Sequence, residues 1–209
     1  MLTPVLIHLA CGCALGAPTP HGAEAIRARD AVIAGDLAAV VASARRLAVS
    51  LPDAGPELSE ALAAVEASRD TVMAGEAMGM VVGQCASCHT RVGVLPSLSD
   101  PAIAPSGGSL PTSMRRHLQG AEGMWSGLVL ADPQRIKQGA SILASSSLTL
   151  TGTPVDSPVS PLATELEVRV HDLAFQASRA DDLQVAASAY GRMLGTCSAC
   201  HAVTGGGPR

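Results

Sequence analysis

Aromatic residues are almost absent from this chain of 209 residues. They make up 1% of the sequence and consist of Trp125, Phe175 and Tyr190 alone, whereas alanine, leucine and valine are plentiful. A core assembled from small aliphatic side chains is thin, because aromatic rings normally supply much of the buried area. The composition therefore suits an interior that receives flat apolar bulk from another source.

Strand signals and an excess of positive charge are also lacking. No segment shows a convincing alternation of apolar and polar residues, which predicts an all-α fold. The net charge is -4 at pH 7, and this acidity argues against nucleic acids and anionic membrane surfaces as partners. The length leaves room for one large or two small domains.

Four of the six cysteines fall in two copies of the pattern Cys-x-x-Cys-His. The copies comprise Cys85, Cys88 and His89, and Cys197, Cys200 and His201. On a helix the three side chains of one copy stand at i, i+3 and i+4 and leave the same face. Two thiols can then add to the vinyl groups of a porphyrin while the imidazole meets the iron, and the pattern is typical of c-type haem attachment. We expect two covalently bound haem c groups, with His89 and His201 as iron ligands.

Zinc and redox chemistry are the alternatives for these cysteines. Two Cys-x-x-Cys pairs suit one zinc ion held by four thiolates, and a single pair suits a thioredoxin-like redox site. Histidine follows the second cysteine in both copies, and both copies lie in helix-like sequence, whereas zinc knuckles prefer turns. The pattern therefore favours haem.

The two motifs close two copies of a longer repeat. Aligned positions include His21 with His117, Ile33 with Val129, and Asp36 with Asp132. Apolar spacing predicts helices at 21–34, 36–49, 57–70 and about 72–89, and again at about 114–130, 133–145, 162–180 and 182–201. Gly35 and Asp36 are the expected C-cap and N-cap of successive helices.

This repeat predicts two tandem four-helix-bundle-like modules, each with a Cys-x-x-Cys-His site on its last helix. We place the modules at 18–90 and 114–203, with a linker rich in proline and glycine at 91–113 and a tail at 204–209. A further loop rich in serine, threonine and proline is expected at about 145–161.

Glycine recurs every four residues in the first motif-bearing helix. Gly75, Gly79 and Gly83 of the first copy match Ala187, Gly191 and Gly195 of the second. Glycine within a helix costs up to about 1 kcal/mol relative to alanine, so the spacing needs a reason. Close approach of a porphyrin and close packing of a neighbouring helix both remain open.

The N-terminal segment is apolar and too short to span a bilayer. Residues 1–17 resemble a secretory signal peptide without its charged start, which predicts export to the periplasm. Cys11 and Cys13 offer a rival interpretation, because acylation of either one would anchor the protein to a membrane.

With its motif near the end of the last helix, each copy resembles the cytochrome c prime class of four-helix bundles, the class II cytochromes c. The resemblance implies covalent haem, export, and either electron transfer or binding of a gas at an open distal face. Bundles of this class often dimerise.

The sixth iron ligand has to come from upstream of the second motif, because only eight residues follow His201. His21 and His117 hold the same offset in both copies, and we expect them to be the distal ligands. A histidine at a helix start also serves as a polar residue or a haem propionate partner. His171 and the methionines at 73, 78, 80 and 193 have no identical partner in the other copy.

These features predict a periplasmic dihaem cytochrome that carries electrons between redox partner proteins and is not an enzyme. A gas-binding or gas-sensing haem protein is the alternative. A dihaem peroxidase is less favoured, because no distal acid–base residue stands out.

Overall fold

A computed structural model describes residues 19–96, 98, 110–146 and 160–205. This part of the chain consists of eight α-helices and the turns between them, with no strand, so the expected all-α class is confirmed. The predicted signal peptide with Cys11 and Cys13 lies outside the described residues, as does most of the loop expected at about 145–161. None of the described helices is both long and apolar enough to cross a membrane.

The helix bounds agree with the sequence pattern to within a few residues. The first half of the fold contains α1 (Pro20–Ala34), α2 (Leu37–Ser50), α3 (Pro56–Glu66) and α4 (Thr71–Val92). The second half contains α5 (Leu110–Val129), α6 (Pro133–Ala144), α7 (Pro161–Arg179) and α8 (Leu183–Thr204). Because α4 runs to Val92 and α5 begins at Leu110, both helices extend into the segment expected to be a linker.

Aspartates at matched positions begin α2 and α6, and a glycine ends α1. Gly35 adopts φ 78° at the end of α1, and the Asp36 carboxylate accepts a hydrogen bond from the backbone of Ala39 at the start of α2. Asp132 caps α6 as Asp36 caps α2. The C-cap and N-cap predicted for Gly35 and Asp36 are therefore confirmed, and they work because glycine tolerates the left-handed conformation while a carboxylate satisfies a free N–H group.

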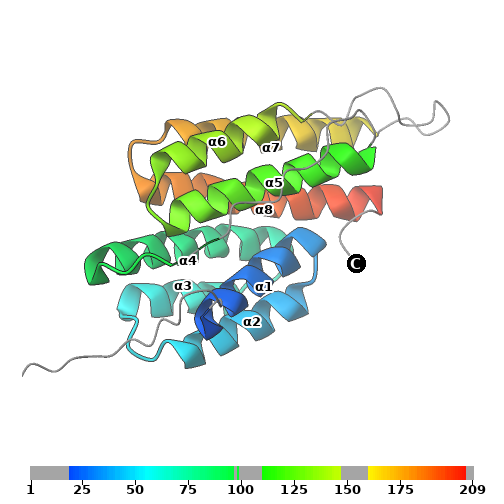
Figure 1. Cartoon of the computed structure of the whole chain (residues 1–209). Helices are drawn as coiled ribbons and strands as arrows, with labels where there is room; N and C mark the ends of the chain where they lie inside the picture. Colours follow the sequence, from blue (N-terminus) through cyan, green and yellow to red (C-terminus); the bar gives the residue numbers. More distant parts are fainter. Residues whose placement is uncertain (1–18, 97, 99–109, 147–159, 206–209) are drawn as a thin grey trace, which may run out of the picture.

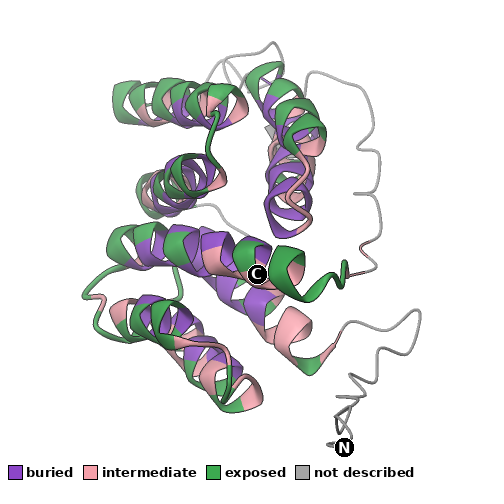
Figure 2. Cartoon of the chain, turned by 90° about the vertical axis from the view of Figure 1, so that its left-hand side faces the viewer, coloured by how far each residue is buried: buried purple, intermediate pink, exposed green. Residues whose placement is uncertain are grey.

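The two motif-bearing helices, α4 and α8, lie side by side in the middle of the molecule (Figure 1). Helices α1, α2 and α3 contact α4 on one side. On the other side α5 and α7 contact α8, and α6 packs on α5 and α7. Helix α1 also contacts α8, and α5 contacts α4. Buried residues face the neighbouring helices, and exposed residues cover the outside (Figure 2).

Glycine permits α4 and α8 to pack with their backbones in contact. The helices run antiparallel, since Gly75 lies opposite Gly195 and Gly79 lies opposite Gly191. A Cβ atom on Gly79 would stand 2.5 Å from the carbonyl oxygen of Ala187 and 3.0 Å from the Cα of Gly191. The recurring glycines therefore serve a neighbouring helix, one of the two explanations that the sequence left open.

The only tryptophan and the only tyrosine meet in the core between the two halves. The Trp125 and Tyr190 ring centroids are 6.3 Å apart, and the Tyr190 hydroxyl donates to the Ala121 carbonyl at 3.2 Å. The buried Arg29 guanidinium of α1 lies over the Trp125 ring of α5 at 5.6 Å. This arginine also pairs with Glu122 at 3.6 Å, so it ties the first helix of each half to that of the other.

We predict that Gly79→Ala destabilises the protein by about 2–3 kcal/mol, because the new methyl group meets backbone that cannot turn aside. This loss exceeds the roughly 1 kcal/mol by which alanine favours a helix over glycine. Gly83→Ala is the matched control, since the nearest atoms there belong to the rotatable Gln184 side chain. Urea denaturation of the two variants measures the difference, and equal stabilities would contradict the backbone contact.

Candidate cofactor-binding sites

Each Cys-x-x-Cys-His motif occupies the last turns of its helix. Cys85, Cys88 and His89 lie near the C-terminal end of α4, and Cys197, Cys200 and His201 lie near that of α8. All six side chains are half-buried, and the four cysteines are free of disulfides. The helical spacing expected from the sequence is therefore present, with both thiols and the imidazole of a motif on one face.

Each motif histidine is anchored by a backbone carbonyl from the opposite half. The Nδ1–H group of His89 donates to the Val129 carbonyl at 3.2 Å, at the end of α5. The Nδ1–H group of His201 donates to the Ile33 carbonyl at 2.7 Å, near the end of α1. Because a carbonyl only accepts, the proton sits on Nδ1 and the lone pair of each ring is on Nε2. This is the orientation that a metal-binding imidazole needs, since an outer partner on one nitrogen aims the other at the metal.

Ile33 and Val129 contact the motif histidines, and sequence reasoning gave them no such role. The only indication in the sequence is that the two residues align with each other in the repeat. Nothing in the side chains shows that their carbonyls accept hydrogen bonds, nor that each serves the opposite half.

The two motifs are too far apart to share one zinc ion. Because α4 and α8 run antiparallel and cross near Gly79 and Gly191, Cys85 and Cys197 lie on opposite sides of the crossing. At 1.5 Å per residue each is about 9 Å beyond it, which separates them by roughly 18 Å along the helices. No four-thiolate cluster occurs among the described residues, and the geometry argues against the zinc alternative.

Burial keeps the inner thiols protonated. It raises the pKa of both Cys85 and Cys197 to about 12, and the neighbouring thiols Cys88 and Cys200 add to the effect. Burial and the Glu167 carboxylate raise the pKa of Cys200. Catalytic Cys-x-x-Cys sites work through a lowered thiol pKa, so this environment also argues against a thioredoxin-like role.

His21 lies beside the first motif. Its ring centroid is 6.4 Å from that of His89, with the ring planes tilted by 47°. Burial and then the charge of His89 lower the pKa of His21. An iron bound by one nitrogen of each ring at about 2 Å needs ring centres roughly 6 Å apart. The ring separation therefore equals that of two imidazoles bound to one iron, while the His21 Nε2 itself lies 3.2 Å from the Thr19 hydroxyl.

His117 has different neighbours from its repeat partner. Its Nε2–H group donates to the Ser146 carbonyl, and its Nε2 lies 3.5 Å from the Nε2 of His171. Burial is the main cause that lowers the pKa of His117 to about 4, and repulsion from His171 and His201 adds to it. Glu167 completes a group whose ligand atoms all lie within 4.8 Å of one another. The sequence alignment gave His171 and Glu167 no role in this group.

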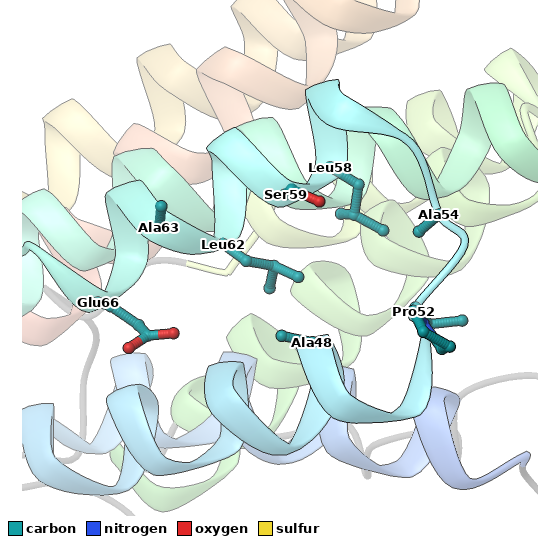
Figure 3. A pocket seen from close by; sticks show the side chains of 9 residues that line it. Ala48, Pro52, Ala54, Leu58, Ser59, Leu62, Ala63 and Glu66 are labelled. Atoms are coloured by element: carbon teal, nitrogen blue, oxygen red, sulfur yellow. The ribbon is translucent and has the colours of Figure 1, made fainter.

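The other candidates lie away from these clusters or in the core. Met78 and Met193 are fully buried in the hydrophobic core, whereas Met73 and Met80 are nearly half exposed. A shallow hollow between α2 and α3 contains none of the predicted site residues (Figure 3). Ala48, Leu58 and Leu62 line it, and its Glu66 pairs with Arg45 at 2.9 Å.

The residues at both motifs fit a covalently bound haem. Each set offers two thiols and an Nε2 lone pair on one helical face, which is the donor set that such a group requires. Comparison with known proteins adds no further assignment: no protein-family model, no curated protein and no solved structure matches the chain.

Proposed function

We propose that this protein is a dihaem c-type cytochrome that carries electrons between redox partner proteins. The proposed attachment residues are Cys85, Cys88, Cys197 and Cys200, and the proposed proximal ligands are His89 and His201. Haem, when bound, supplies reversible one-electron chemistry at its iron. The protein's own contribution is to hold, orient and bury the group.

The matched anchoring of the two motif histidines is the observation that carries the proposal. Both Nδ1–H groups donate to carbonyls at equivalent positions of the repeat, Val129 and Ile33. This hydrogen bond places the ring proton on Nδ1, and the lone pair of Nε2 then points away from the carbonyl. Two sites prepared in the same way support two equivalent cofactors, one for each copy of the repeat.

The two proposed distal ligands, His21 and His117, differ in how well their surroundings support the role. The 6.4 Å separation of the His21 and His89 rings supports His21 as the distal ligand of the first haem. For the second haem, the repeat alone supports His117 as the distal ligand, because its Nε2 is directed at Ser146 and His171. A six-coordinate first haem passes electrons without an open position for dioxygen or nitric oxide.

We propose two four-helix units of class II type, in which the motif histidine of each unit donates a hydrogen bond to a carbonyl of the other unit. Helix α1 begins beside the first motif and ends beside the second, since His21 neighbours His89 and Ile33 accepts from His201. Twelve residues of helix separate these two positions by about 18 Å. Helix α5 provides the reciprocal Val129 contact, so both sites belong to one packed body through which electrons can pass.

Export to the periplasm is part of the proposal and rests on the signal-like residues 1–17 and on the haem motifs. A lipid anchor through Cys11 or Cys13 remains the alternative to cleavage. A homodimer is the alternative to a monomer.

Gas binding at the second haem is the other candidate function. It is favoured by one observation, the turning of the His117 Nε2 toward Ser146 and His171. An iron ligated by His201 alone would keep an open position. Rapid uptake of carbon monoxide by half of the reduced haem would support this function.

We predict that replacing one cysteine pair removes one haem and leaves the other. Cys85→Ala with Cys88→Ala, and separately Cys197→Ala with Cys200→Ala, should each halve the haem that stays attached after acid and acetone extraction. Mass spectrometry of the chain measures the loss. Retention of both haems in either variant, or no haem on the unaltered chain, would refute the attachment sites.

We predict that His21→Ala converts the first haem from low spin to high spin and opens it to carbon monoxide. His21→Met is the matched variant, because a thioether restores a sixth ligand and raises the reduction potential. Visible and electron paramagnetic resonance spectra of the two variants measure the change. Low-spin bands that persist unchanged in His21→Ala would remove His21 from the iron.

A further inference from the structure

Three side chains of the second half converge, and the first half has no histidine to match one of them, His171. His117 lies on α5, and Glu167 and His171 lie one turn apart on α7. Residues at i and i+4 share a helix face, so α7 presents a carboxylate and an imidazole together toward His117. The alignment that pairs Glu66 with Gln176 places Ala61 opposite His171, which confines the cluster to the second half.

The spacing of the two imidazoles matches a shared metal ion. Their Nε2 atoms are 3.5 Å apart, and two nitrogens bound tetrahedrally to one zinc ion at 2.0–2.1 Å stand about 3.4 Å apart. A carboxylate oxygen of Glu167 lies within 4.8 Å of a ring nitrogen of each histidine. Release of the Ser146 hydrogen bond, transfer of the His117 proton from Nε2 to Nδ1 and small side-chain rotations would complete a set of two histidines and one glutamate. This set leaves zinc one position for another ligand.

The surroundings suit a cation. Glu167 is only 5% exposed, and its carboxylate lies beside both imidazoles. The Ser146 carbonyl at the His117 Nε2 adds a nearby oxygen.

The location is one where helical proteins build metal centres. In the second half, α5 and α7 lie diagonally opposite each other, and α6 and α8 each contact both of them. Side chains that project inward from facing helices of a bundle are the usual source of such sites. The ligands therefore come from rigid elements whose relative positions are fixed by packing.

We propose that His117, Glu167 and His171 bind a divalent transition-metal ion of the zinc type, and that His117 serves this ion instead of the second haem. The site stands on these three residues and does not depend on the haem proposal. It explains why His117 and His21, which match in the repeat, have different neighbours.

The test uses the full-length protein with its haems attached. Metal is removed with a chelator, zinc is added, and bound zinc is counted by mass spectrometry and titrated by calorimetry, while haem is counted separately as its pyridine complex. The expected result is one zinc per chain in the unaltered protein. His171→Ala and Glu167→Gln should each weaken zinc binding by more than about a hundredfold, since removal of a direct ligand exceeds the loss caused by an outer partner.

His21→Ala and His117→Ala are the decisive matched pair. His21→Ala should leave zinc binding intact, whereas His117→Ala should abolish it without changing the spin state of either haem. The proposal is overturned if the unaltered, haem-loaded protein takes up no stoichiometric zinc. It is equally overturned if His117→Ala converts one haem from low to high spin, because His117 would then be an iron ligand. A chain that binds zinc but carries no haem would refute the proposed function and leave this site standing.

Discussion

The direct backbone contact between α4 and α8 is the constraint on which the rest of the structure depends. Gly79 and Gly191 lie where the helices cross, and even one added carbon atom would collide with the opposite chain. This closeness brings α1 within reach of α8 and α5 within reach of α4. With a wider separation, neither Ile33 nor Val129 could accept a hydrogen bond from the motif histidine of the other half.

The exchange of carbonyls makes the two halves interdependent. Each motif helix supplies its own cysteines and histidine, but the partner that sets the orientation of the histidine belongs to the other half. Arg29 and Trp125, which align in the repeat, add a second link between α1 and α5. The two halves therefore form one packed body in which each motif histidine depends on the other half.

Much of this fold could be predicted from the sequence, because its signals are local. Apolar spacing located all eight helices of the described part, and Gly35 and Asp36 marked one boundary through their own conformational preferences. The spacing of Cys85, Cys88 and His89 similarly revealed a single helical face.

What escaped prediction depends on contacts between distant residues. The glycines of α4 suited a porphyrin as well as a helix, and a carbonyl such as that of Val129 leaves no trace in the residue type. His171 lacked a repeat partner and received no role, although that same asymmetry marks the cluster with His117 and Glu167.

The carbonyl exchange also sets an order of assembly as the chain is made from its N-terminus. His201 finds its acceptor Ile33 already synthesised 168 residues earlier. His89 must wait for Val129, which follows it by 40 residues. The first motif is thus complete in sequence well before its histidine can be oriented, whereas the second acquires its support as soon as α8 folds against α1. The wait is thus 40 residues for the first site and none for the second, and because Val129 precedes Cys197 the first site can still be completed first.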